Sequence, residues 1–278
     1  MPKIRIGIRQ LSQKILAKKS APLDAVKAIM TTDTFPKLVR RAFKVGTKTV
    51  TVWGCAKGSG MIHPNMATMF SFILTDAALP KPKLQFYLKE AAAGTFNSLS
   101  VDGDTSTNDC VFLLANGASA TLSKESDQKK FQQTLQEVCL ELARQMASDG
   151  EGATKRIEIF VKGARQLSDA HQVAATVATS PLVKTAFFGE DANWGRVLAA
   201  VGRSGVMVNP DKIDIYFGNL CLFKSGRPVS FSETRAKKIL QEKVVELAIH
   251  LNQGTAQSQY LTCDFSLDYV KINADYRS

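Results

Sequence analysis

Hydrophobic and polar positions follow helical spacing over several separate stretches of the chain. The clearest helix is predicted over residues 126–148, whose apolar side chains recur three or four positions apart: Phe131, Leu135, Val138, Leu142 and Met146. Ser126 stands where an N-cap residue would begin this helix. The same spacing predicts two short helices within residues 12–30, the second ending at Thr31, and further helices over 84–99, 167–178, 193–202 and 232–241.

Alternating or β-branched apolar positions predict strands between these helices. The strands cover residues 48–56, 69–74, 110–115, 156–161, 213–217, 220–223, 244–251 and 260–272. Gly218-Asn219, between two of them, predicts a hairpin. Helices mixed with hairpin-linked strands indicate an α/β (α+β) fold with largely antiparallel sheets. The Ser180-Pro181 pair predicts a boundary between a larger domain, residues 1–180, and a smaller one, residues 181–278.

One stretch stands out chemically: residues 57–76, with the sequence KGSGMIHPNMATMFSFILTD. Glycines and a proline lead to the small pair Ala67-Thr68, and an apolar strand pattern follows. Such a loop suits a hydroxyl group held at a strained turn. From the residues alone, an ordinary threonine at the start of a strand fits the same pattern, so both interpretations stay open.

The whole of this stretch resembles the self-cleavage segment of the ornithine acetyltransferases, or glutamate N-acetyltransferases, of arginine biosynthesis. The resemblance continues in the family's order through further blocks of the chain: TTDTFPK (31–37), VDGDTSTND (101–109), DGEGATK (149–155), KTAFFGEDANWGRVLAAVGRSG (184–205) and KINADYRS (271–278). Because similar blocks recur over nearly all of the chain, the match is highly specific.

The resemblance implies both a fold and an activity. The fold would be the αββα sandwich of the self-processing group, with a smaller C-terminal α/β domain. The bond between Ala67 and Thr68 would be cut autocatalytically, and the freed Thr68 would be the nucleophile. It would carry an acetyl group from N-acetylornithine to glutamate in a ping-pong reaction. No cofactor is implied, and acetyl-CoA is a further donor for some family members.

The chemistry of a threonine at a cleaved bond is consistent with that role. The Thr68 hydroxyl would attack the Ala67 carbonyl, moving the acyl group from nitrogen to oxygen, and water would release the ester. The new α-amine of Thr68, with an ordinary pKa of about 8, would then act as the base for its own hydroxyl.

Two charged side chains are suited to an amino-acid substrate. Lys57 precedes the expected nucleophile across a turn, where an ammonium group suits a carboxylate. Glu151 offers a carboxylate to the cationic end of ornithine. Each of them is equally compatible with an ordinary solvated side chain. The resemblance implies that both are substrate contacts, together with Thr32 (or Thr31), Asn273 and Ser278, where family members usually have Thr.

The sequence departs from the family at its start. Family members normally carry a long segment before the point that matches Met1, with a Ser-Thr-Gly motif whose Thr and Gly form the oxyanion hole. Two hypotheses follow: the chain is an acetyltransferase, or it is a shortened relative that folds or binds partners without turnover. A self-cleaving aminopeptidase of the same fold group fits less well, because those enzymes use a different nucleophile motif.

The composition is that of an ordinary globular protein, with 45% hydrophobic and 22% charged residues. The net charge is +11, but Lys and Arg are scattered along the chain, so no nucleic-acid surface is predicted. No apolar run is long enough to cross a membrane, and the N-terminus lacks the apolar core of a secretory signal. We expect a cytoplasmic protein, and the resemblance implies a heterotetramer of two α and two β chains after cleavage.

Cysteines and acidic residues bear on metal binding. The five cysteines show no CxxC spacing, which predicts free thiols rather than disulfides or a zinc site. The Asp-rich block 101–109 lacks the further ligands of a calcium loop. Hydrogen bonds from its side chains to neighbouring backbone are therefore favoured over metal binding, and no metal site is predicted.

Overall fold

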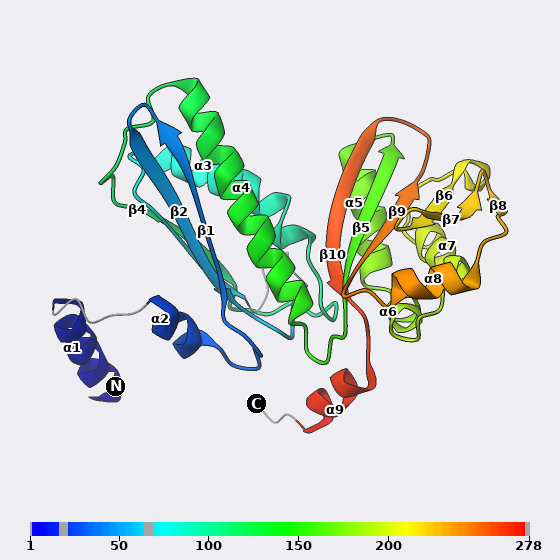
Figure 1. The fold of residues 1–278 in the computed structure, drawn as a ribbon, viewed down its shortest axis with the longest axis horizontal. Coiled ribbons are helices and arrows are strands. Elements are labelled where there is room, and N and C mark those ends of the chain that lie inside the picture. Colours follow the sequence, from blue (N-terminus) through cyan, green and yellow to red (C-terminus); the bar gives the residue numbers. More distant parts are fainter. Residues whose placement is uncertain (1, 17–21, 64–68, 276–278) are drawn as a thin grey trace.

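The computed structural model describes residues 2–16, 22–63 and 69–275, which form a mixed α/β fold with two β-sheets (Figure 1). The sheets lie beside each other along the long axis of the molecule, and each packs its own hydrophobic core. The first sheet has the order β1 (Lys37–Val45), β2 (Lys48–Lys57), β3 (Phe70–Thr75), β4 (Cys110–Ala115).

The second sheet joins six strands from the later part of the chain. Its order is β10 (Ala256–Cys263), β5 (Arg156–Ala164), β9 (Val244–His250), β6 (Asp214–Phe217), β7 (Leu220–Lys224), β8 (Arg227–Pro228). Most neighbouring strands are antiparallel, as the sequence predicts. The exceptions are the parallel pairs β3–β4 and β5–β9.

Helices α3 (Lys81–Ala93) and α4 (Glu125–Ser148) pack with one face of the first sheet in a common core. Gly54 in β2 sets how closely α4 approaches. A Cβ atom at this position would lie 2.8 Å from Cγ1 of Val138 and 2.9 Å from Cδ1 of Leu142, closer than carbon atoms tolerate. The absence of a side chain in β2 therefore allows the helix to pack directly on the strand.

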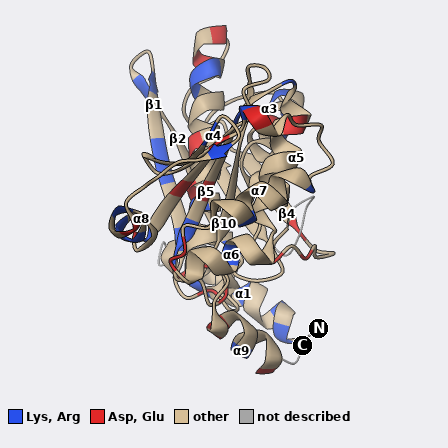
Figure 2. Cartoon of the chain, turned by 90° about the vertical axis from the view of Figure 1, so that its right-hand side faces the viewer, with Lys and Arg blue, Asp and Glu red and all other residues tan. Residues whose placement is uncertain are grey.

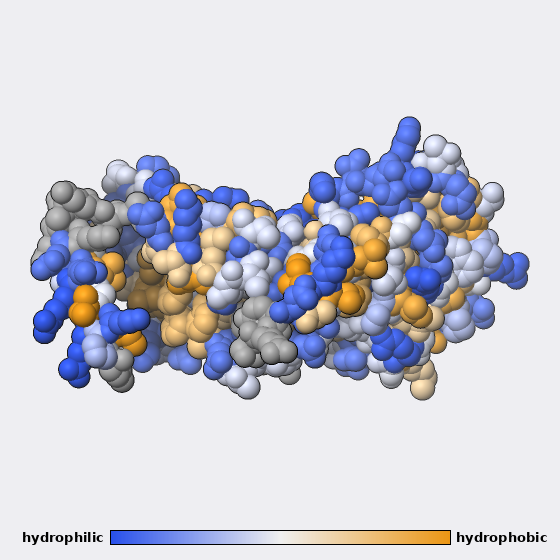
Figure 3. Space-filling view, turned by 90° about the horizontal axis from the view of Figure 1, so that it is seen from below, coloured by the Kyte–Doolittle hydropathy of each residue, from blue (hydrophilic) through white to orange (hydrophobic). Residues whose placement is uncertain are grey.

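The opposite face of the first sheet is apolar and open to solvent. Directly paired residues of neighbouring strands point to the same side of a sheet, so Phe72 and Phe112 share this face, where their rings stack 5.3 Å apart. Leu74 and Leu114 form the next pair on it and are 44% and 52% exposed. Figure 3 shows apolar side chains at the surface of this half of the molecule, which also carries the exposed helix α1 (Pro2–Leu16).

The second sheet packs against the helices that follow β5. These are α5 (Leu167–Ala178), α6 (Pro181–Phe188), α7 (Trp194–Gly202) and α8 (Glu233–Leu240). The buried ammonium group of Lys155 donates to the carbonyl oxygens of Phe187 (3.1 Å) and Leu240 (2.6 Å). Because these residues lie in the last turns of α6 and α8, the cation lies where the negative ends of two helix dipoles meet.

One buried carboxylate connects the two halves. Glu158 in β5 accepts two parallel hydrogen bonds from Arg144 of α4, both 3.0 Å long, and a third contact from Arg156. Paired bonds between a guanidinium group and a carboxylate fix orientation as well as distance. The last part of α4 is therefore attached to the second sheet.

Charged residues are distributed over both halves. Figure 2 shows Lys and Arg on several helices and strands, with Asp and Glu among them. None of the described helices is both long and apolar enough to cross a membrane. All five cysteines are free, and Cys55, Cys139 and Cys263 are buried.

The structure confirms most of the predicted elements. The strand over 110–115, the helix over 167–178 and the hairpin across Gly218-Asn219 have the predicted positions. Three predictions are wrong. Helix α4 begins at Glu125, so Ser126 is not its N-cap. The predicted helix over 84–99 ends at Ala93, before a short 3₁₀ turn, η1 (Phe96–Ser98).

The third wrong prediction is the strand over 260–272. Strand β10 ends at Cys263, and helix α9 (Leu267–Asp275) follows. The Ser266 hydroxyl accepts hydrogen bonds from the backbone N–H groups of Asp268 and Tyr269, in the manner of an N-cap. Helix α6 was also missed: Pro181 begins this helix, because proline suits the first helical position.

The boundary predicted at 180/181 lies between α5 and α6. Buried side chains of both helices, such as Val177 and Val183, belong to the core of the second sheet. The division into domains 1–180 and 181–278 stays a prediction. Of the remaining elements, α2 (Pro22–Ile29) precedes β1, and the short turn η2 (Pro210–Lys212) precedes β6.

The close approach at Gly54 gives a stability test. We expect Gly54→Ala to lower the free energy of unfolding by about 1–3 kcal/mol, because the new methyl group must push Val138 and Leu142 of α4 away. Urea unfolding followed by circular dichroism measures it. The control is Gly202→Ala, where nothing lies within 4 Å of the new Cβ. Equal loss of stability in both variants would contradict this packing.

Candidate active site

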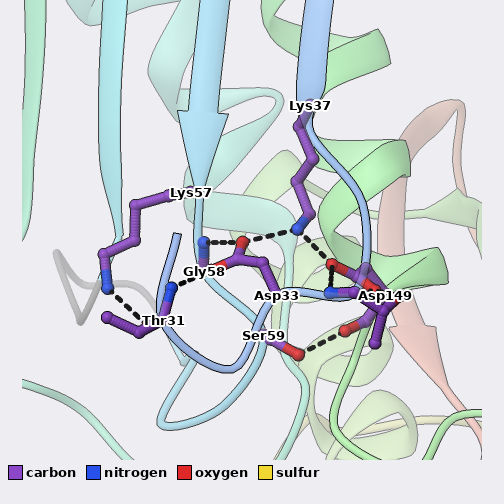
Figure 4. Close-up of polar contacts among 8 residues, drawn as sticks. Thr31, Asp33, Lys37, Lys57, Gly58, Ser59 and Asp149 are labelled. Atoms are coloured by element: carbon purple, nitrogen blue, oxygen red, sulfur yellow. Dashed lines mark hydrogen bonds and ion pairs between the residues drawn. The ribbon is translucent and has the colours of Figure 1, made fainter. Parts of the chain in front are cut away.

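Three loops meet at one end of the first sheet and carry most of the expected site residues (Figure 4). They are the segment between α2 and β1, the segment after β2 and the segment after α4. Lys57, the last residue of β2, is buried, and its ammonium group donates a 3.1 Å hydrogen bond to the Thr31 hydroxyl. This hydrogen bond holds the Lys57 cation against the segment between α2 and β1.

A buried cluster of charges joins the three loops. The ammonium group of Lys37 lies between the carboxylates of Asp33, 2.6 Å away, and Asp149, and all three side chains are 0–1% exposed. Gly58, just after β2, donates its N–H to Asp33 at 2.7 Å. Thr34 donates its N–H to Asp149 at 3.1 Å. Each buried carboxylate is thus paired and hydrogen-bonded, as a stable buried ion group requires.

The surroundings of Asp33 keep it ionised. Burial acts to raise its pKa, but the N–H group of Gly58, the ammonium group of Lys37 and the N–H group of Thr31 act more strongly together. The pKa of the Asp33 carboxyl is therefore lowered from its ordinary value.

Glu151 lies beside this cluster. Its backbone N–H donates to the Ser59 carbonyl at 2.8 Å, and the Ser59 hydroxyl donates to the Asp149 carbonyl. The side-chain amide of Asn273, in α9, donates to the Glu151 carboxylate at 3.0 Å. A Cβ atom on Gly60 would overlap that carboxylate, so only glycine at 60 leaves Glu151 in this position.

The loop 101–109 holds both sides of the segment that contains the expected cleavage site. On one side, Asp102 accepts the N–H groups of Met61 and Ile62, at 2.6 and 3.0 Å. The Thr105 hydroxyl donates to the His63 carbonyl at 3.0 Å. These bonds confirm that this loop binds neighbouring backbone through its side chains.

On the other side, the same loop binds the start of β3. Met69 donates its N–H to the carboxylate oxygen Oδ1 of Asp109, and Cys110 donates its N–H to the Met69 carbonyl at 3.0 Å. Burial raises the pKa of Asp109 to about 6, although the Met69 N–H and the nearby Lys57 cation act to lower it. Among the described residues, its second oxygen Oδ2 has no hydrogen-bond partner.

Comparison with known sequences assigns the chain to a family. A sequence profile of the ArgJ family matches residues 1–278. The arginine biosynthesis bifunctional protein ArgJ of Symbiobacterium thermophilum is 47% identical over all of this chain and 69% of its own length. The ArgJ protein of Bacillus subtilis is 43% identical over all of this chain and 68% of its own length.

The chain belongs to the ArgJ family. It spans about two thirds of the length of these relatives, and 65% of the ArgJ protein of Desulfotalea psychrophila, to which it is 51% identical. Among solved structures, it resembles the arginine biosynthesis bifunctional protein ArgJ of Bacillus halodurans, with a TM-score of 0.72 and 44% identity. That match covers 74% of this chain and 98% of the solved chain.

The structure of this ArgJ-family chain brings four of the expected site residues to one end of the first sheet. Thr31 and Lys57 are in direct contact, and so are Glu151 and Asn273. Thr32, which the sequence favours over Thr31, is half-buried. The remaining expected residues, Ala67, Thr68 and Ser278, lie outside the described residues. The assignment of roles to all of them stays a prediction.

Sequence reasoning gave no role to several residues that build the site. These residues lie within three of the blocks that carry the family resemblance: Asp33 and Lys37 in 31–37, Asp109 in 101–109 and Asp149 in 149–155. Only the pairing of Asp33 with Lys37 could have been predicted from the sequence, because these opposite charges are four residues apart. Within the described parts of the chain, no group of three or more His, Cys, Asp and Glu residues is arranged to hold a metal ion.

Removing the cation of the cluster tests its contribution to stability. We expect Lys37→Met to lower the free energy of unfolding by about 3–5 kcal/mol, because two buried carboxylates lose their counter-charge. Urea unfolding at neutral pH measures the loss. The control is Lys129→Met, which removes an exposed pair with Glu125 and should leave the midpoint unchanged. Matching midpoints for the two variants would contradict a structural role for Lys37.

Proposed function

We propose that this chain is a self-cleaving acyltransferase that uses Thr68 as an N-terminal nucleophile and moves an acetyl group from N-acetylornithine to glutamate. The observation that carries the proposal is the loop 101–109, which holds His63 on one side of the Ala67–Thr68 bond and Met69 on the other. Lys57, on the neighbouring strand β2, adds the charge that an amino-acid substrate needs.

The solved relative supports cleavage at this bond. Nearly all of its chain is matched by about three quarters of this one. The part of this sequence that follows Ala67 is also about three quarters of its length. A solved chain of that length is the size expected for the larger product of cleavage before Thr68.

The reaction would proceed in two stages. In the first, the Thr68 hydroxyl attacks the Ala67 carbonyl, the peptide C–N bond breaks, and water hydrolyses the resulting ester. In the second, the free α-amine of Thr68 accepts the proton of its own hydroxyl, which attacks the acetyl carbonyl of N-acetylornithine. Ornithine leaves, and the amine of glutamate takes the acetyl group from the Thr68 oxygen.

Charge would select the substrates. The Lys57 ammonium group suits the α-carboxylate that N-acetylornithine and glutamate share. Glu151, oriented by Asn273, suits the side-chain ammonium group of ornithine. Thr32 or Thr31 and the C-terminal Ser278 would supply further hydrogen bonds. Acetyl-CoA would be a further donor substrate, and this chemistry uses no cofactor or metal.

The open face of the first sheet supports an αββα sandwich as the fold of the full-length family members. Leu74, Phe112 and Leu114 leave it apolar and exposed, and this chain spans only about two thirds of the length of the relatives. We propose that the remaining third of an ArgJ chain packs a second sheet here, which completes an αββα sandwich. We also propose a cytoplasmic heterotetramer of two α and two β chains as the assembled form, with no nucleic-acid or membrane partner.

The alternative function follows from the same comparison. If the oxyanion hole lies in the part of the relatives that this chain does not span, the 278 residues fold and bind without turnover. The exposed sheet face favours this alternative for the chain on its own. Cleavage and transfer can be measured separately, so the two hypotheses are distinguishable.

Self-cleavage gives the most direct test. We expect the purified chain to separate into pieces of about 7 and 23 kDa, because the sequence around Ala67–Thr68 retains the features that activate the hydroxyl. Intact mass spectrometry measures it. The control Thr68→Ala should remain a single species of 30.3 kDa. An uncut wild-type chain would refute self-processing by these 278 residues.

Turnover should depend on the part of the family that this chain does not span. We expect acetyl transfer by the chain alone to be slower by about a hundred- to a thousandfold for each missing oxyanion donor. The remaining third of a relative, fused or added in trans, should restore the rate. Release of ornithine from N-acetylornithine in the presence of glutamate is the measurement. Equal rates with and without the added segment would show that the oxyanion donors lie within this chain.

A further inference from the structure

The Asp33 carboxylate connects the two segments that carry the expected substrate contacts Thr31 and Lys57. Its oxygen Oδ2 accepts the backbone N–H of Thr31 at 3.1 Å, and Oδ1 accepts the backbone N–H of Gly58 at 2.7 Å. Gly58 directly follows Lys57, and the ammonium group of Lys57 donates to the Thr31 hydroxyl at 3.1 Å (Figure 4). One carboxylate therefore joins the two backbones beside the point where their side chains meet.

These contacts hold Lys57 on both sides along the chain. Strand pairing holds the residue itself, because Lys57 is the last residue of β2 and pairs with Phe70 of β3. The Lys57 carbonyl group and the Gly58 N–H belong to one planar peptide unit. The bond from Gly58 to Asp33 therefore fixes the orientation of the peptide that follows Lys57.

The ion group contains a second carboxylate that lacks these contacts. The side chain of Asp149 is bonded to the same ammonium group of Lys37 and is equally buried, with 1% of it exposed against 0% for Asp33. Its remaining hydrogen bonds come from the N–H and hydroxyl groups of Thr34. Of the two side chains, within the described residues, only that of Asp33 also binds the segment after β2. The two carboxylates thus share a role in stability but differ in what they hold.

We propose that Asp33 is the positioning residue of the Lys57–Thr31 pair and that it sets the affinity of the site for an α-carboxylate. This inference rests on the proposed function, in which the Lys57 ammonium group binds the α-carboxylate that N-acetylornithine and glutamate share. A charge-assisted hydrogen bond needs a well-aligned donor. By holding residues 31 and 58 together, Asp33 keeps the ammonium group in place before the ligand arrives, so binding does not have to order it.

The test is Asp33→Asn. A carboxylate accepts hydrogen bonds on both oxygens, whereas an amide accepts on its oxygen only and carries an NH2 donor. The variant therefore loses one of its two bonds to the N–H groups of Thr31 and Gly58. Its fold is kept, because Lys37 still pairs with Asp149 as one cation with one carboxylate. We expect the dissociation constant of glutamate, measured by isothermal titration calorimetry, to rise about tenfold or more.

Two controls separate positioning from stability. Asp149→Asn removes an equally buried carboxylate from the same cation, so it should lower the midpoint of urea unfolding by a similar amount but weaken glutamate binding much less. Isoglutamine, in which the α-carboxylate of glutamate is an amide, should bind with the same affinity to Asp33→Asn and to the wild type. Glutamate is the suitable probe because it binds without reacting when no acetyl donor is present. It also lacks the ammonium side chain that Glu151 would hold.

The outcomes distinguish the positioning role from the proposed function. A loss of affinity for glutamate but not for isoglutamine, much larger in Asp33→Asn than in Asp149→Asn, supports the positioning role. Asp33→Ser takes the place of the Asn variant if that variant does not fold. Wild-type affinity for glutamate in the folded variant, equal losses in both Asn variants or an equal loss for isoglutamine would overturn the role and leave the proposed function intact. A wild-type chain that does not bind glutamate would overturn both.

Discussion

The ion group formed by Lys37, Asp33 and Asp149 is the interaction on which the candidate site depends. Its members come from the start of β1, the loop before it and the end of α4, and Gly58 connects it to the end of β2. Burying three charges is costly unless every one is paired and hydrogen-bonded. The arrangement that satisfies them also determines where the three loops can lie. Thr31 and Glu151 are each two residues from a member of the group, so their positions follow from it.

A second constraint comes from the parallel pairing of β3 and β4. Parallel strands place their starting ends together, so the loop 101–109 that precedes β4 lies beside the segment that precedes β3. Side chains of the loop then bind the backbone on both sides of residues 64–68. The ion group orders the loops that would bind substrate, and the strand pairing orders the flanks of the bond that would be cut. Both act at the same end of one sheet.

The sequence predicted the parts of the structure that depend on local spacing. The strand over 110–115 and the helix over 167–178 could be predicted because their apolar periods are regular. Helix α9 could not be predicted in this way. Its start depends on the cap that Ser266 provides, and the apolar residues of α9 read as a continuation of strand β10. In the site, Lys57 and Glu151 were recognised by their charge and by the family blocks. The pairing of Lys37 with Asp149 was not predictable, because more than a hundred residues separate them and only the packing of α4 on the sheet brings them together.

The pKa values of two buried carboxylates at this end of the sheet are shifted in opposite directions. The difference follows from the groups that surround each carboxylate. Asp33 receives two backbone N–H groups and an ammonium group, which lower its pKa despite burial. Among the described residues, Asp109 receives the N–H group of Met69 and has Lys57 nearby, and burial outweighs both and raises its pKa to about 6. Hydrogen-bond donors and cations favour the charged form of a carboxylate and burial opposes it, so the balance between them sets the direction of each shift. The same residue type is thus stabilised as a charge within the ion group and shifted toward the neutral form beside β3.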